Sequence, residues 1–239
     1  MRQERLHPGK DVQPPFVTDF TKRFRAAPTS VTVLAAANAL PVLGVVGLGW
    51  EVFPLVLLYW CENVIVGTIN VFKILTSRPR EVAGWVGKVF AAPFFVFHYG
   101  MFTAIHGVFV FALFGGAAAQ ALLDSAGIFP SPMLAVRAIR ETGIGVAVLA
   151  LVASHGFSFV RNYLLGGEFH HATINNLMQQ PYNRVVVLHV TIIVGGGLLM
   201  MLGSPMPGLL LLVLLKTGVD IAAHLKERAK FGSLGSVGS

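Results

Sequence analysis

Residues 89–123 read VFAAPFFVFHYGMFTAIHGVFVFALFGGAAAQALL, and none of them is Asp, Glu, Lys or Arg. A helix needs about 20 mostly apolar residues to cross a bilayer, because it rises about 1.5 Å per residue. One spanning helix therefore fits inside this stretch, and we place it at about 88–114.

The composition of the whole chain is that of a membrane protein. Of the 239 residues, 54% are hydrophobic and 12% are charged, and the mean hydropathy is +0.70. Soluble globular domains carry about 25% charged residues, which keep their surfaces in water. These figures exclude a soluble globular domain, a disordered chain, collagen and a coiled coil. The single cysteine, Cys61, excludes a disulfide framework and a multi-thiolate metal site.

Five further apolar runs are long enough to cross a bilayer, at about 30–49, 51–74, 141–163, 183–202 and 207–226. The turn GSPMPG, residues 203–208, separates the last two runs, because its prolines and glycines interrupt a helix. The sequence therefore predicts an all-α fold, a polytopic integral membrane bundle of about six transmembrane helices. Five spans remain an alternative if the run that contains Pro41 does not cross fully.

The chain divides into a cytoplasmic N-terminal segment, residues 1–29, a single transmembrane bundle domain, residues 30–228, and a tail, residues 229–239. The tail ends in GSLGSVGS, which is typical of a flexible linker. Lys and Arg concentrate in the regions that would face the cytoplasm, whereas the outer loops hold only Arg137 and Arg140. This asymmetry predicts a multi-pass protein of the bacterial inner membrane with both termini in the cytoplasm.

The formal net charge of +7 does not indicate a nucleic-acid partner. Its basic residues lie at the chain ends and between apolar runs, without interleaved aromatic residues that would form a binding groove. We expect them to contact the headgroups of membrane lipids. The sequence leaves a homo-oligomer open.

Many polar residues interrupt the predicted spans, where ionisable groups are costly and usually face the interior of the bundle. Some of them repeat at intervals of four residues, which places them on one face of a helix. His98, Phe102 and His106 follow this spacing, as do Lys216, Asp220 and His224. The polar residues of the other spans include Glu62, Asn63, His155, Asn162 and His189.

We interpret this set as an intramembrane metal site in the cytoplasmic half of the bundle. Imidazole and carboxylate ligands without thiolate suit zinc first, and also iron or copper. The predicted ligands are His98, His155, His189, Asp220 and His224. Glu62 and Lys216 are the predicted catalytic residues. Glu62 could be a metal ligand, a partner that orients an imidazole ligand, or a general base, and Lys216 could orient a ligand or polarise a substrate. His106, Asn63 and Asn162 are expected to support them.

This interpretation makes the protein a metalloenzyme, a hydrolase or an oxidoreductase, that acts on a lipid-soluble or membrane substrate. Three alternatives use the same residues. Carboxylates and histidines can relay protons or ions through a membrane. Paired histidines from two spans can bind haem. The histidines can also do no more than hydrogen-bond between helices.

Five strings carry a resemblance to a known family: YWCENVIVGTINVFK (59–73), FHYGMFTAIHGVF (97–109), SHGFSFVRNYLLGGEF (154–169), PYNRVVVLHVTIIVGG (181–196) and LLKTGVDIAAHLKER (214–228). Over about residues 30–228, the chain resembles a bacterial membrane family that is catalogued as domain of unknown function 6498. The resemblance implies a compact multi-span inner-membrane protein built around these polar residues. It implies no particular activity.

Overall fold

A computed structural model describes residues 42–47, 49–79, 82–117 and 132–235 of the chain. The chain forms two units, residues 39–216 and residues 1–38 together with 217–239. The described residues form helices and turns, and no strand occurs among them. The predicted all-α fold is therefore confirmed.

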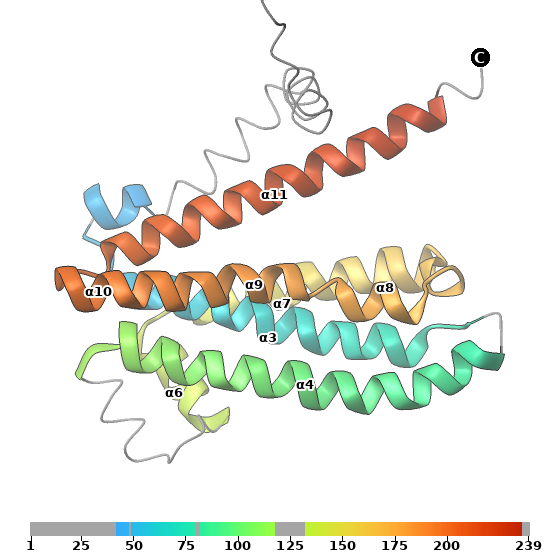
Figure 1. Ribbon diagram of the computed structural model, residues 1–239, viewed down its shortest axis with the longest axis horizontal. Helices are drawn as coiled ribbons and strands as arrows, with labels where there is room; N and C mark the ends of the chain where they lie inside the picture. The colour runs from blue at the N-terminus through green and yellow to red at the C-terminus, as the bar shows by residue number, and fades with distance from the viewer. Residues whose placement is uncertain (1–41, 48, 80–81, 118–131, 236–239) are drawn as a thin grey trace, which may run out of the picture. The chain divides into compact units, whose positions relative to one another are not determined.

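Helix α3 (Val52–Thr76) lies at the centre of the unit formed by residues 39–216. Helix α4 (Val82–Phe114) follows after a short connection and runs back beside it (Figure 1). The two helices approach closely because Gly107 leaves room for the ring of Trp60, where an added Cβ would lie 2.9 Å from a ring carbon. Trp60 donates a hydrogen bond from Nε1 to the Thr103 carbonyl oxygen at 2.8 Å, so its indole is satisfied in the core.

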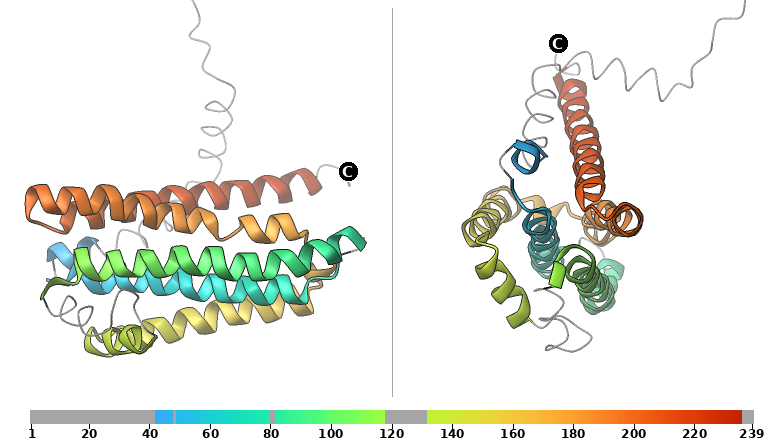
Figure 2. Two further views of the ribbon diagram at one scale, coloured as in Figure 1. Left: turned by 60° about the horizontal axis from the view of Figure 1, so that its bottom comes forward. Right: turned by 90° about the vertical axis from the view of Figure 1, so that its left-hand side faces the viewer.

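The opposite side of α3 is covered by α7 (Gly145–Ser158), which follows the short helix α6 (Pro132–Glu141). Figure 2 shows α3 between α4 and α7. The π-helical segment η1 (Phe159–Leu165) prolongs α7. The chain then forms a 3₁₀ turn, η2 (Glu168–His170), and the short helix α8 (Ile174–Gln179) before it turns back.

The fifth predicted run forms one continuous helical segment of three parts, α9 (Tyr182–Val190), the π-helical η3 (Thr191–Gly195) and α10 (Gly196–Leu202). It ends at Gly203, whose positive φ of 65° suits glycine at a helix C-terminus. Helix α11 (Met206–Gly235) begins inside the predicted turn at residues 203–208, so Pro207 and Gly208 lie in its first turn, and it continues from the first unit into the second.

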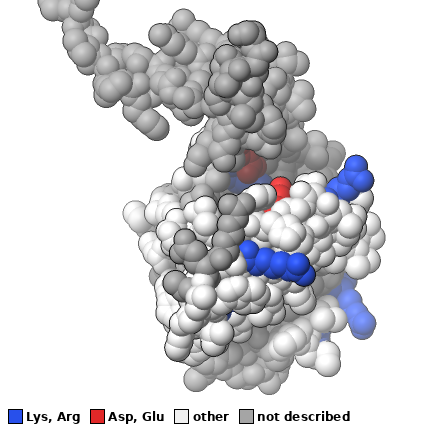
Figure 3. Space-filling model, turned by 90° about the vertical axis from the view of Figure 1, so that its right-hand side faces the viewer, with Lys and Arg blue, Asp and Glu red and all other residues white. Residues whose placement is uncertain are grey.

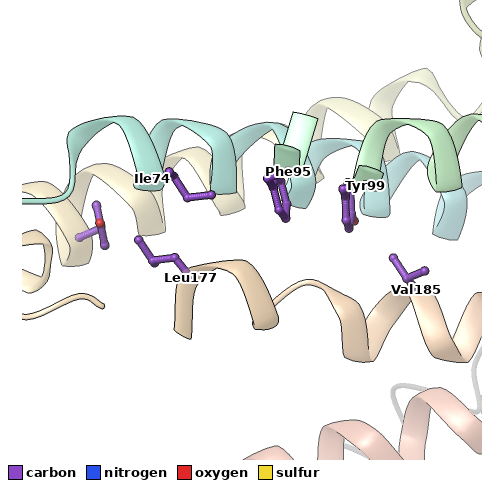
Figure 4. Packing of buried hydrophobic residues seen from close by; sticks show 6 residues of the cluster. Ile74, Phe95, Tyr99, Leu177 and Val185 are labelled. Carbon is purple, nitrogen blue, oxygen red and sulfur yellow. The ribbon is translucent and has the colours of Figure 1, made fainter. Parts of the chain in front are cut away.

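The core of this unit is a cluster of buried residues from five segments: Ile74, Phe95, Tyr99, Tyr163, Leu177 and Val185 (Figure 4). Phe95 and Tyr99 stack one turn apart on α4, with ring centroids 4.9 Å apart. The buried phenols are satisfied, since Tyr99 donates to the Asn63 carbonyl oxygen at 2.9 Å and Tyr163 donates to the Lys73 carbonyl oxygen at 2.8 Å. The cluster fixes α3 against α4, η1, α8 and α9.

Four helical runs are long and apolar enough to cross a membrane: Val52–Thr76, Gly84–Phe114, Gly145–Leu165 and Ile174–Leu202. They correspond to the second to fifth predicted spans. Large apolar residues of these helices, such as Phe90, Phe97 and Leu149, are about 70% exposed. Such exposure is expected of a surface that contacts lipid. The first predicted span, at about 30–49, lies mostly outside the described residues. The side chains of the sixth are described only as far as Ala222, so the count of six stays a prediction.

Figure 3 views the end of the molecule at which α3 ends and α4 begins, where Lys and Arg side chains project from a mostly uncharged surface. Arg78 is exposed in the connection between the two helices, and its guanidinium lies over the ring of Phe169, 5.4 Å from the centroid. The Arg78 backbone N–H donates to the Phe169 carbonyl oxygen at 3.0 Å. These contacts tie this connection to the segment that joins η1 to α8.

Candidate functional site

Glu62 lies in the middle of α3, and its side chain is only 9% exposed. An ionised carboxylate in such a place is costly unless cations and hydrogen-bond donors surround it. The neighbouring turns of α3 supply no cation, because the residues one turn away are Leu58, Tyr59, Ile65 and Val66. The partners of Glu62 must therefore come from other helices.

Three helices provide them. Arg184 of α9 places Nη1 2.6 Å from Glu62 Oε1, and Lys216 of α11 places Nζ 3.2 Å from Oε2. His155 of α7 places Nε2 3.4 Å from Oε1. The three partner side chains are 27–31% exposed, so the cluster is shielded by the helices but not sealed. We call these four residues the Glu62 cluster.

Lys216 is also held by an aromatic ring. Its Nζ lies 5.0 Å from the ring centroid of Tyr59, which precedes Glu62 by one turn on α3. A cation over an aromatic face gains electrostatic attraction, and this gain grows where water is scarce. Two neighbouring groups of α3 thus fix the position of the lysine.

A polar cavity of about 270 Å³ adjoins the Glu62 cluster, between α3, the end of α7 and the start of α9. Its walls include the basic side chains of Lys73, His155 and Arg184, and no carboxylate lies among its described lining residues. Asn70, Ser158 and Gln180 add neutral polar groups to the wall. The rest of it is apolar, from Val66, Ile69, Phe159 and Pro181. His155 and Arg184 therefore contact Glu62 and also face the cavity.

Lys73 and Asn70 are anchored in this wall. The Nζ of Lys73 lies 5.2 Å from the ring centroid of Tyr163, and Asn70 donates from Nδ2 to the Leu177 carbonyl oxygen at 2.7 Å. Both residues follow Glu62 along one side of α3, at intervals that suit a helix face. The cavity thus has a fixed wall from α3 and a second wall from the partners of Glu62.

The predicted metal ligands do not gather in one place in the described part of the chain. His155 contacts Glu62, whereas the Nδ1 of His98 lies 2.7 Å from the hydroxyl of Tyr182. His189 lies in a third pair, with its Nδ1 2.9 Å from the Nε2 of His106. No group of three or more His, Cys, Asp or Glu side chains that could hold a metal ion occurs among the described residues.

The other predicted residues have separate surroundings. Asp220 belongs to the second unit, and the side chain of His224 lies outside the described part. Asn63 is buried and donates from Nδ2 to the Tyr59 carbonyl oxygen at 3.0 Å. Asn162 is exposed and donates to the Ser158 hydroxyl at 3.3 Å. The structure therefore brings together Glu62, His155 and Lys216 of the predicted set.

Sequence reasoning missed Arg184 and Lys73 as members of a site. Basic residues near the ends of spans usually set the topology of a membrane protein, and the sequence interpretation of Arg184 is of that kind. One signal could have found Arg184. A lone carboxylate in a spanning helix requires a cationic partner, and few Lys or Arg residues lie near enough in depth to serve.

The family model described as Family of unknown function (DUF6498) matches residues 21–234 of the chain. No curated protein matches the chain, and no solved structure does. The match covers the described helices and the residues of the Glu62 cluster. The chain belongs to this family of unknown function.

Proposed function

We propose that this membrane protein binds the acidic head of an amphipathic molecule in the cavity beside Glu62. The observation that carries the proposal is the composition of the cavity wall, where Lys73, His155 and Arg184 meet without a carboxylate among the described lining residues. Basic side chains held at membrane depth lose much of their hydration, so an anion that enters the cavity gains strong charge-assisted hydrogen bonds.

Arg184 can serve Glu62 and a ligand together. A guanidinium has five N–H donors, and the contact with Glu62 is made through Nη1. The planar fork leaves further donors for a carboxylate or phosphate on the cavity side. Glu62 is then a positioning residue that holds Arg184 and His155 in the wall and limits the net positive charge of the site.

The size of the cavity favours a headgroup over a whole lipid. Pockets for drug-sized ligands measure about 300–1,000 Å³, and this cavity has a volume of about 270 Å³. A phosphate or carboxylate with a few attached atoms fits such a space, while apolar chains extend along the helices. A lipid bound in this way would be one of the membrane lipids predicted as partners of the chain.

The experiment that tests the proposal compares two lipids with the same acyl chains, of which only one carries a phosphate headgroup. Full-length protein in phosphatidylcholine nanodiscs is titrated with dioleoyl phosphatidic acid and with dioleoylglycerol, and retention is measured by native mass spectrometry. We expect preferential retention of the phosphatidic acid. Oleate and inorganic phosphate form two further arms, which distinguish a lipid carboxylate and a free anion from a lipid phosphate.

Substitutions of basic residues test whether phosphatidic acid binds in this cavity. Lys73→Gln and Arg184→Gln should each weaken retention of phosphatidic acid about tenfold, which corresponds to about 1.4 kcal/mol. Lys88→Gln is the control, since Lys88 donates to the Ser77 carbonyl oxygen and does not line the cavity. Equal losses in the Lys73 and Lys88 variants would overturn the proposal, because they would indicate attraction by the basic surface alone.

The predicted metal centre stays a prediction that the same preparation tests. His155 and Glu62 place an imidazole and a carboxylate together, whereas a catalytic zinc site uses three protein ligands. Elemental analysis for zinc, iron and copper, with His155→Ala and Asp220→Ala as controls, decides between a metal site and an anion site. An absorption band of haem would favour the haem alternative, and proton flux in liposomes that depends on Glu62 would favour the conduit.

A further inference from the structure

Two histidines from different spans meet in an otherwise apolar groove. His106 of α4 is 3% exposed, and its Nε2 lies 2.9 Å from the Nδ1 of His189 on α9. The groove has a volume of about 350 Å³ and lies between α4 and the run from α9 to α10. Its other lining residues are all Phe, Ile, Leu, Met or Gly, and exposed Ile105, Phe109 and Met200 place its mouth on the outer surface of the helices.

A neutral imidazole has one N–H donor and one acceptor nitrogen, so one of the two rings donates in this contact and the other accepts. When the Nδ1–H of His189 donates to Nε2 of His106, the Nε2 of His189 is an acceptor.

This arrangement leaves a lone pair on Nε2 of His189. No hydrogen-bond partner of that atom occurs among the residues that the structure describes. His189 is exposed and lines the groove, so a ligand in the groove can reach this nitrogen. His106 and His189 are the only ionisable residues in the described wall of the groove. A ligand that uses it must supply a hydrogen-bond donor on an otherwise apolar body.

We propose that this groove binds a membrane-soluble phenol or quinol, whose hydroxyl donates a hydrogen bond to Nε2 of His189. The rings of Phe102 and Phe109 offer aromatic walls against which a phenol ring can pack. Gly197 leaves open space, since an added Cβ there would meet nothing within 4 Å. The groove contains none of the residues of the Glu62 cluster, so this site is independent of the anion site.

A pair of probes tests the hydroxyl directly. Tritiated 4-dodecylphenol and 4-dodecylanisole have the same ring and chain, but the ether lacks the O–H donor. Binding to full-length protein in nanodiscs is measured by scintillation proximity and corrected for partition into empty nanodiscs. We expect the phenol to bind about tenfold more tightly than the ether. Equal affinity of the two probes for the unaltered protein would overturn the proposal without any variant.

Variants place the phenol in the groove. His189→Phe removes the lone pair and should reduce phenol affinity about tenfold, to the level of the ether. His189→Gln keeps an acceptor and should retain most of the affinity. His98→Phe is the matched control, because His98 pairs with Tyr182 outside this groove and its loss should leave phenol affinity unchanged. Equal losses in the His98 and His189 variants would contradict the proposed place.

Discussion

The carboxyl group of Glu62 lies in the middle of a helix that is long and apolar enough to span a membrane, and it meets three nitrogen-bearing side chains from three other helices. A buried ion pair contributes little net stability when it forms, because both charges lose their hydration. The removal of one partner is costly, because the other charge then stays buried without compensation. Each residue of the Glu62 cluster should therefore be sensitive to substitution.

The substitution Glu62→Gln should lower the free energy of unfolding by about 1–3 kcal/mol, because it leaves Arg184 and Lys216 without their carboxylate in a poorly hydrated site. This range allows for the partial exposure of the partner side chains. The measurement is reversible unfolding in mixed micelles by titration with dodecyl sulfate.

Glu141→Gln provides the control for this prediction. Glu141 forms an ion pair of 2.7 Å with Arg137, and both side chains are about half exposed or more. Exposed pairs contribute about 0–1 kcal/mol, so this variant should unfold almost as the unaltered protein does. A Glu62→Gln variant as stable as Glu141→Gln would contradict the assigned role of Glu62.

Part of the site could be predicted from residue types alone. The cost of ionisable groups in a bilayer indicated Glu62, His155 and Lys216, and these three residues do meet. The pairing of His98 with Tyr182, and of His189 with His106, could not be predicted. Spacing along one helix indicates on which face of the helix a residue lies. Which side chain of another helix it contacts depends on how the two helices are rotated relative to each other.

At the scale of elements, the contact between α3 and α4 depends on small residues. Gly67 of α3 faces the ring of Tyr99, and an added Cβ would overlap that ring. Tyr99 is buried in the core cluster and donates to the Asn63 carbonyl oxygen, so it has little freedom to move. The contact leaves no room for a larger residue at position 67.

Gly67→Ala should therefore destabilise the bundle by about 1–3 kcal/mol, the usual cost of an overpacked core. Gly87→Ala on α4 is the matched control, since an added Cβ there meets nothing within 4 Å. The control should be neutral or slightly stabilising, because alanine favours a helix more than glycine does. Unfolding in mixed micelles compares the two variants, and equal stability would contradict the close packing of α3 on Tyr99.

Hydropathy predicted the elements better than their ends. The predicted span at about 51–74 agrees closely with α3, and the span at about 183–202 agrees with the run from Tyr182 to Leu202. Helix α4 begins at Val82, six residues before the predicted start, because a helix continues past the apolar part that ends near Lys88. The π-helical segments η1 and η3 could not be predicted, since wide turns depend on backbone hydrogen bonds and leave no apolar pattern.

At the scale of the whole molecule, the distribution of Lys and Arg predicts which connections face the cytoplasm. Arg78 lies between the second and third predicted spans, which we place on the cytoplasmic side, and Arg137 of α6 lies in a predicted outer loop. With both termini cytoplasmic, the two residues face opposite sides of the membrane. The low charge content predicts a membrane protein but does not indicate which side of the membrane each connection faces.

Single cysteines test the topology. The native Cys61 is buried and is replaced by Ser, and Arg78→Cys or Arg137→Cys is introduced. A maleimide that cannot cross membranes should label the Arg137→Cys variant in intact bacterial cells. It should label the Arg78→Cys variant only after the membrane is permeabilised. The reverse pattern of labelling would place both termini outside.

The central claim is that polar side chains from separate spans converge on Glu62, and a double-mutant cycle on Glu62 and Arg184 tests it most directly. Unfolding free energies are measured in mixed micelles for the unaltered protein, Glu62→Gln, Arg184→Gln and the double variant. Residues in contact give interaction energies of about 0.5–3 kcal/mol, and separate residues give additive effects. We predict a coupling of about 1–3 kcal/mol, so that the double variant is more stable than the sum of the single losses implies. Strict additivity of the two substitutions would contradict the claim.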